Sequence, residues 1–281
     1  MPQYHTLISV TELAASLAHP GLVVFDCRHD LASYEAGRRA YAGSHIPGAR
    51  FLHLDEDLSG PKTGINGRHP LPHPQTLALR LAALGVTNTS QVVAYDASGG
   101  CFAARLWWML RWIGHDRVAV LDGGWDAWTG AGQPVSAEIA KPAPGGLTIN
   151  MMDSAGVNTA YVERHLRQPV MALIDARSPD RYAGQNESLD PVAGHIPGAR
   201  NRFFRLNLAD DGRFKSADAL RGEFEALLGG APAESVVHQC GSGVTACHNL
   251  LAMEYAGLKG ARLYPGSWSA WVSDRQRPVE T

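Results

Sequence analysis

The chain has 281 residues and a formal net charge of −2, with charges of both signs. This balance leaves no basic surface for nucleic acid and no polybasic patch for membranes. No stretch approaches the roughly 18 apolar residues of a membrane span, and the first residues lack the basic and apolar regions of a secretion signal. We therefore expect a soluble, cytoplasmic protein. The four irregularly spaced cysteines match neither a disulfide framework nor a zinc site.

The first half of the chain alternates helical and strand patterns. Apolar residues at helical spacing predict helices, and continuous apolar runs predict strands buried on both faces of a sheet. In chain order, we expect a helix at 10–17, a strand at 22–26, a short helix at 31–36, a helix at 72–84, a strand at 92–95, a helix at 101–113 and a strand at 118–121.

The second half follows the same plan. We expect a helix at 158–166, a strand at 170–174, a helix at 217–228, a strand at 236–239, a helix at 245–256 and a strand at 261–264. Such alternation is typical of an α/β fold, with a mostly parallel sheet and helices on both faces. The proline- and glycine-rich segment 130–146 predicts a linker between the halves.

Four sequence blocks occur twice in the same order. The offset between copies runs from 150 residues, for His45 and His195 in two His-Ile-Pro-Gly-Ala-Arg turns, to 143 residues, for Trp125 and Trp268. A period this long indicates whole domains and not a solenoid. We therefore predict two homologous domains, 1–140 and 141–281, each able to bury its own core.

One cysteine stands at the tip of a predicted strand in the second copy. Cys240 follows the strand at 236–239, and a Gly-Ser-Gly loop leads from it to a helix that begins near Thr245. The N–H groups of such a loop and the positive end of the helix dipole favour the thiolate, which is the nucleophilic form of cysteine. At the equivalent position the first copy has Asp96, so only one copy carries the thiol.

Together, the Asp-x-Arg strands, the His-Ile-Pro-Gly-Ala turns, the strand-Cys-loop-helix and the closing Gly-Trp or Gly-Ser-Trp resemble the two-domain rhodanese family of sulfurtransferases. The resemblance covers essentially the whole chain. It implies an inactive N-terminal domain, in agreement with Asp96, and a catalytic C-terminal domain. It also implies a ping-pong reaction, in which Cys240 takes sulfur from a donor as a persulfide and passes it to an acceptor. Sulfur itself is the cargo, so we expect no metal and no organic cofactor.

The loop after the cysteine bears on the donor. Family members that prefer thiosulfate resemble Cys-Arg-Lys-Gly-Val-Thr, with two cations for a dianion. This chain is instead similar to 3-mercaptopyruvate sulfurtransferases, since its loop reads Cys240-Gly241-Ser242-Gly243-Val244-Thr245. The backbone amides from Gly241 to Thr245 are expected to hold the anionic persulfide.

The resemblance implies further site residues. In mercaptopyruvate enzymes the loop serine works with a histidine and an aspartate of the N-terminal half, and the matching positions here are Ser242, His69 and Asp55. A hydroxyl suits this donor because pyruvate leaves as an enolate that must be protonated. The alternatives are a solvent-exposed loop histidine at 69 and plain surface charge at 55.

Arg181 matches the family arginine that holds the donor's carboxylate or sulfonate through paired N–H bonds, unless it is a helix-surface arginine. Trp268 matches a residue that walls the pocket. Mercaptopyruvate enzymes then resemble Glu-Pro-x-Pro-Arg and use that second arginine for the carboxylate, but the segment 186–191 has no arginine. The loop thus favours 3-mercaptopyruvate, and the missing arginine favours the alternative, a thiosulfate:cyanide sulfurtransferase.

Two other classes of function are compatible with such a sheet. A cysteine phosphatase needs arginine six residues after its cysteine, where this chain has Ala246. The intact Cys240 loop argues against a non-catalytic binding module. Relay of sulfur to a protein acceptor is compatible with the same residues. We expect a small-molecule donor, an acceptor that is a thiol, cyanide or thioredoxin, no nucleic-acid partner, and a monomer.

Overall fold

The computed structural model describes residues 2–281, which form two compact units. Of the described residues, the first unit holds 2–60, 72–152 and 210–213, and the second holds 61–71, 153–209 and 214–281. The segment 61–71 therefore packs with the second unit, although it lies far from the rest of that unit in the sequence. The predicted division at residue 140 remains a prediction. No helix among residues 2–281 is long and apolar enough to cross a membrane.

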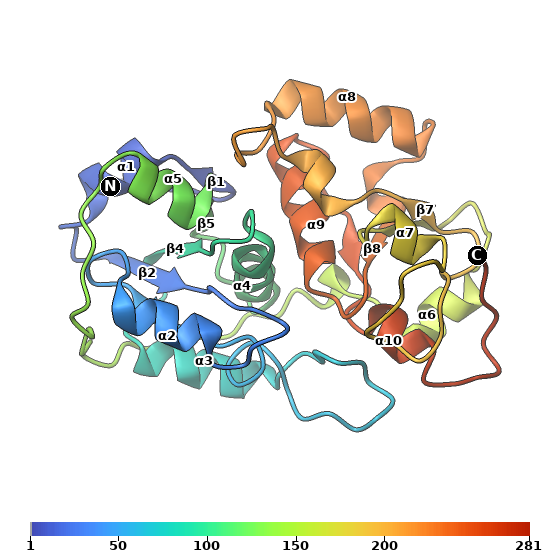
Figure 1. The fold of residues 1–281 in the computed structure, drawn as a ribbon, viewed down its shortest axis with the longest axis horizontal. Helices are drawn as coiled ribbons and strands as arrows, with labels where there is room; N and C mark the ends of the chain where they lie inside the picture. The colour runs from blue at the N-terminus through green and yellow to red at the C-terminus, as the bar shows by residue number, and fades with distance from the viewer. Residues whose placement is uncertain (1) are drawn as a thin grey trace. The chain divides into compact units, whose positions relative to one another are not determined.

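A five-stranded parallel sheet forms the centre of the first unit, with strand order β1-β5-β4-β2-β3. Its strands are β1 (Leu7–Ile8), β2 (Leu22–Asp26), β3 (Arg50–Phe51), β4 (Gln91–Tyr95) and β5 (Val118–Leu121). Its helices are α1 (Val10–Ser16), α2 (Ala36–Gly43), α3 (Pro74–Ala83), α4 (Cys101–Trp112) and α5 (Gly124–Gly130). Figure 1 shows α2 and α3 across the sheet from α1 and α5. Every residue of β4 is buried, as its continuous apolar run predicts.

The second unit has a four-stranded parallel sheet, with strand order β7-β6-β8-β9. Its strands are β6 (Ala172–Asp175), β7 (Arg200–Asn201), β8 (Val236–Gln239) and β9 (Arg262–Leu263). Its helices are α6 (Thr159–Arg164), α7 (Pro179–Tyr182), α8 (Ala217–Leu228), α9 (Thr245–Tyr255) and α10 (Ser267–Trp271), with short 3-10 turns η1 (Asp153–Ala155), η2 (Phe204–Asn207) and η3 (Ala233–Ser235). The predicted α/β class with two parallel sheets is confirmed.

The two units repeat one structural device at a strand end. In each, the Asp-x-Arg arginine donates to the aspartate two residues earlier, Arg28 to Asp26 at 2.5 Å and Arg177 to Asp175 at 2.7 Å. Each guanidinium also lies over the ring of a tryptophan, 4.2 Å from that of Trp125 in the first unit and 4.8 Å from the equivalent ring in the second. Because both units carry this ion pair, it serves the fold.

The prediction of a short helix at 31–36 is wrong, because residues 31–35 form turns and α2 begins only at Ala36. Asp30 causes this. Its carboxylate accepts the Ala32 N–H at 2.8 Å and its carbonyl accepts the Ser33 N–H at 3.2 Å. Such local bonds compete with the helical ladder. The patterns missed α2 and the shorter elements β1, β3, β7, α5, α7 and α10.

The segment 130–146 contains no helix or strand after α5 ends at Gly130, but it is held along the first unit. Ser136 pairs with His45 in an antiparallel bridge, and Gly146 pairs with Thr87 in a parallel one. These backbone hydrogen bonds hold the predicted linker against the first unit at Ser136 and at Gly146.

Candidate functional site

Cys240 lies directly after β8, at the carboxyl end of the sheet, where parallel sheets expose reactive groups. It is buried, and its backbone is held on both sides. The Cys240 N–H donates to the Ser267 hydroxyl at 3.1 Å, and its carbonyl accepts the Trp268 N–H at 3.0 Å. The Gly243 N–H donates to the sulfur at 3.2 Å. The loop therefore directs a backbone donor at the sulfur atom.

Gly243 shapes this loop. Its φ is +77°, a left-handed conformation that L side chains rarely adopt, and an added Cβ would lie 2.4 Å from the carbonyl oxygen of Pro265. Both facts exclude a side chain here. Val244 follows as a buried residue, and the half-buried Thr245 is the first residue of α9. The predicted loop from Gly241 to Thr245 thus turns tightly from β8 into a helix.

Ser242 and His69 are in contact. The Ser242 hydroxyl and Nδ1 of His69 lie 2.7 Å apart, and both residues are buried, each 6% exposed. His69 is therefore not a solvent-exposed loop histidine, and the segment 61–71 that carries it belongs to the second unit. A hydroxyl that is hydrogen-bonded to an imidazole can donate its proton to a reacting group and take a proton from the imidazole in return. This arrangement suits general acid catalysis.

Arg181 lies on α7 and is held by a carboxylate. Glu187 accepts from Nη2 of Arg181 at 2.8 Å and from Nε at 3.2 Å, and it also lies 3.3 Å from Nη1 of Arg177. Burial alone would raise the pKa of Glu187, but the Leu189 N–H and the Arg181 guanidinium outweigh it and lower that pKa. Glu187 is thus a fixed anion that orients Arg181.

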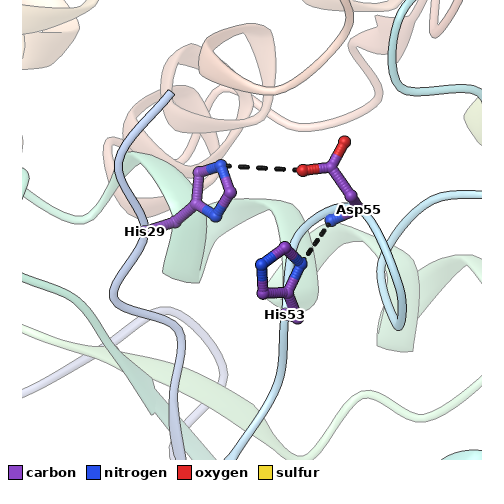
Figure 2. Close-up of side chains that lie close together, drawn as sticks. All are labelled: His29, His53 and Asp55. Carbon is purple, nitrogen blue, oxygen red and sulfur yellow. Dashed lines mark hydrogen bonds and ion pairs between the residues drawn. The ribbon is translucent and has the colours of Figure 1, made fainter. Parts of the chain in front are cut away.

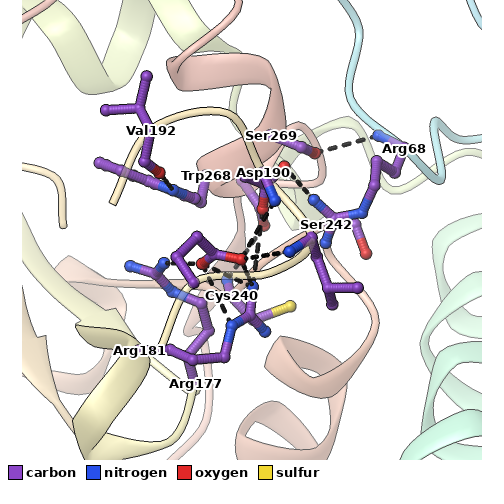
Figure 3. Close-up of polar contacts among 12 residues, drawn as sticks. Arg68, Arg177, Arg181, Asp190, Val192, Cys240, Ser242, Trp268 and Ser269 are labelled. Atoms are coloured by element: carbon purple, nitrogen blue, oxygen red, sulfur yellow. Dashed lines mark hydrogen bonds and ion pairs between the residues drawn. The ribbon is translucent and has the colours of Figure 1, made fainter. Parts of the chain in front are cut away.

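Arg68 is a site residue that the patterns did not single out. Its guanidinium forms an ion pair with Asp190, whose other carboxylate oxygen lies 3.6 Å from Nη2 of Arg181 (Figure 3). Two signals could have found this pair. Arg68 immediately precedes His69, and Asp190 lies in the segment 186–191, where the chain departs from mercaptopyruvate enzymes.

Trp268 is fully buried, and its indole N–H donates to the Val192 carbonyl at 2.9 Å. Its ring packs against Arg177, while its backbone N–H holds the Cys240 carbonyl. The side chain belongs to the core of the second unit, so its connection to the cysteine is through the backbone.

Asp55 belongs to the first unit, where it lies beside two histidines (Figure 2). Nε2 of His29 is 3.8 Å from its carboxylate, and the Asp55 N–H donates to Nδ1 of His53 at 3.1 Å. The other ring nitrogen of His53 bonds the Tyr34 carbonyl at 2.9 Å. Both nitrogens of His53 are therefore used by the backbone, and the remaining two groups are too few for a protein metal site. The pairing of Asp55 with His69 stays a prediction.

Known proteins resemble this chain along its full length. The sequence model of the rhodanese-like domain matches residues 9–131 and 158–274. A protein of Pseudomonas aeruginosa named "probable 3-mercaptopyruvate sulfurtransferase" is 48% identical over 277 residues, which is 98% of each chain. This chain belongs to the rhodanese family. Because the domain matches twice, the predicted duplication is confirmed as a tandem of rhodanese domains.

Other members of the rhodanese family are named as sulfurtransferases. The thiosulfate sulfurtransferase of Bos taurus is 34% identical over 289 residues, 99% of this chain and 95% of that protein. Among solved structures, the 3-mercaptopyruvate sulfurtransferase of Leishmania major has a TM-score of 0.83 at 30% identity, over 96% of this chain and 75% of that one. SseA of Escherichia coli, described as a 3-mercaptopyruvate sulfotransferase, has a TM-score of 0.82 at 28% identity, over 94% of this chain and 99% of that one. The predicted membership of a sulfurtransferase family is confirmed.

Proposed function

We propose that the protein transfers sulfur from 3-mercaptopyruvate to a thiophilic acceptor through a persulfide on Cys240. The observation that carries this choice of donor is the 2.7 Å contact between Ser242 and His69, in the loop that follows the nucleophile. The name of the Pseudomonas aeruginosa relative supports the same donor.

The first half-reaction needs a nucleophile and a proton source. The Cys240 thiolate attacks the sulfur of the donor, an S–S bond forms, and the C–S bond breaks with its electron pair left on pyruvate as the enolate. The Ser242 hydroxyl protonates the enolate carbon, and His69 restores the proton to the serine. Thiosulfate would leave as sulfite, which needs no proton, so this serine–histidine pair has a task only with an enolate-forming donor.

The charge of the site also favours a singly charged donor. The three guanidinium groups of the site face three buried carboxylates, so their formal charges cancel; the residues are Arg68, Arg177, Arg181, Asp175, Glu187 and Asp190. A neutral set can offer directed N–H groups to one carboxylate, which 3-mercaptopyruvate has. Without a net positive charge, such a site is a weaker host for the thiosulfate dianion.

Steady-state transfer from 3-mercaptopyruvate and from thiosulfate, measured side by side, tests the proposal. We expect kcat/KM to be at least about tenfold higher with 3-mercaptopyruvate, and a Cys240→Ala variant to lose roughly a thousandfold or more of either activity. Cys247→Ala is the control for loss of a thiol, because Cys247 is fully buried in the first turn of α9, where its thiol donates to the Gly243 carbonyl. A preference for thiosulfate would overturn the choice of donor. If neither donor gave turnover that depends on Cys240, a non-catalytic or relay module would be favoured.

The acceptor and the assembly state are expectations drawn from the sequence. A small thiol, cyanide or thioredoxin can each take the outer sulfur of a persulfide, and a monomer acting in the cytoplasm remains our prediction. Competition among the three acceptors for Cys240 persulfide would rank them.

A further inference from the structure

We propose that Asp190 is a specificity-determining residue: its buried carboxylate disfavours a doubly charged donor such as thiosulfate and leaves the site open to a singly charged one. The inference rests on the proposed function and deepens it, because it names the residue whose charge selects the donor. Asp190 lies in the segment 186–191, where the chain departs from mercaptopyruvate enzymes. At this point the chain supplies an acid and no arginine.

Asp190 is an anion that the second unit shields from water. Its side chain is only 3% exposed, and Oδ1 forms an ion pair with Arg68 (Figure 3). The other oxygen, Oδ2, is buried and accepts no hydrogen bond from residues 2–281. It lies 3.6 Å from Nη2 of Arg181, which is too far for a hydrogen bond. A buried carboxylate oxygen without a donor is costly, so its presence calls for an explanation beyond packing.

The surroundings of Asp190 do not fully stabilise its charge. Burial raises the pKa of this carboxyl, and the nearby Glu187 carboxylate raises it further; Arg68 and Arg181 lower it without cancelling the rise. The surroundings therefore stabilise one negative charge less well than water does. Both arginines already have carboxylate partners, since Glu187 pairs with Arg181 at 2.8 Å. An incoming anion with two charges meets the same deficit twice over.

The charge of Asp190 acts close to the nucleophile. A Cβ added to Gly241, the residue after Cys240, would lie 2.8 Å from Nη2 of Arg68 and 3.5 Å from Nη2 of Arg181. Because that nitrogen of Arg181 also faces Asp190, an anion bound to the same guanidinium lies within roughly 7 Å of the Asp190 carboxylate. Repulsion over this distance grows with the charge of the donor, so a dianion is repelled about twice as strongly as a monoanion.

The loop after the nucleophile does not offset this repulsion. Family members that prefer thiosulfate resemble Cys-Arg-Lys, with two cations in the loop itself. This chain has Gly241 and Ser242 at those positions. Removing the charge of Asp190 alone would leave one arginine without a counter-ion, and the donor site would gain one net positive charge.

The test is an Asp190→Asn variant, which keeps the shape of the side chain and removes its charge. We expect the kcat/KM for thiosulfate, divided by that for 3-mercaptopyruvate, to rise about tenfold through a gain with thiosulfate. A merely structural role predicts losses, so a gain separates the two. The control is Asp274→Asn, which removes an exposed carboxylate of the same unit, paired with Arg277, and should leave the ratio unchanged.

A second measurement is independent of turnover. Anions that occupy the donor site slow the alkylation of Cys240 by the neutral reagent iodoacetamide. Inorganic sulfate serves as the dianion and acetate as the monoanion, and the concentration of each that halves the alkylation rate is determined. In Asp190→Asn we expect both concentrations to fall, and that of sulfate to fall about tenfold more than that of acetate.

Each contrary result is distinct. Losses with both donors and weaker protection by both anions would make Asp190 a structural support for Arg68 and overturn the inference. An unchanged donor ratio, or equal changes for sulfate and acetate, would also overturn it. If the wild-type protein preferred thiosulfate while Asp190→Asn still favoured sulfate over acetate, the proposed donor would fail and the selection by charge would stand.

Discussion

The two rhodanese domains each have a strand-to-helix loop. The two loops share one backbone conformation and differ in the residue at the strand tip. In the first, β4 leads through Asp96 into α4, and in the second, β8 leads through Cys240 into α9. The glycines at matching positions have φ +71° in Gly99 and +77° in Gly243. The backbone closure is also the same, since a tryptophan N–H bonds the Asp96 carbonyl at 2.8 Å and the Cys240 carbonyl at 3.0 Å.

The difference lies in what the loop amides bind. In the first domain the Asp96 carboxylate accepts four N–H groups at 2.7–2.9 Å, those of Ser98, Gly100, Phe102 and Ala103. Burial raises the pKa of Asp96, and these N–H groups counteract that rise. The N–H groups of the first loop thus form an anion-binding site, and the carboxylate of the loop's own Asp96 occupies it. The second domain has a thiol there, so a matching cradle can receive the charge of a persulfide instead.

Removing the Asp96 carboxylate should destabilise the first loop more than any other substitution there. Asp96→Ala leaves buried N–H groups without an acceptor, so we expect the free energy of unfolding to fall by about 2–4 kcal/mol. Urea denaturation measures this, with Asp126→Ala on the exposed side of α5 as the control. A loss no greater than that of the control would show that the four hydrogen bonds contribute nothing net.

A matched pair of serines sharpens the comparison. Ser242 and Ser98 stand at equivalent positions of the two loops, and the Ser242 hydroxyl contacts His69. We expect Ser242→Ala to lower kcat with 3-mercaptopyruvate by roughly 10- to 100-fold, because enolate protonation slows. Turnover of thiosulfate should fall much less, and Ser98→Ala should change neither. Equal losses with both donors would argue against proton donation by Ser242.

The strands that precede the two loops differ at one titratable position, so we expect pH to affect the stability of the two domains differently. His238 in β8 is fully buried, and burial lowers its pKa from 6.5 to about 3; the matching residue of β4 is Ala94. Unfolded His238 takes up a proton below pH 6.5 and folded His238 does not, so stability is lost as pH falls from 6.5 towards 3. At pH 5 this loss is about 2 kcal/mol. His238→Leu should flatten the pH dependence of urea denaturation between pH 7 and 5. An unchanged slope would contradict the shift.

Local patterns were enough for the long elements and missed several of the shorter ones. The buried strands and the helices of a few turns carry their own periodicity, which is why β4, β8, α4, α8 and α9 could be predicted. Elements such as β3 and β7 have two residues each, and neighbouring strands induce them through ladder hydrogen bonds. At 31–36 the side chain of Asp30 decided the outcome, since its turn replaced the expected helix.

The sequence by itself determined the duplication, the place of Cys240 at a strand tip and the loss of the thiol at Asp96, because these depend on residues that are neighbours in the chain. Only the tertiary structure decided that the segment 61–71 joins the second unit and that Arg68 reaches Asp190 beside Gly241. An ion pair between residues more than a hundred positions apart leaves no periodic trace. It exists because packing brings two loops to the same strand end, and buried charges there must pair.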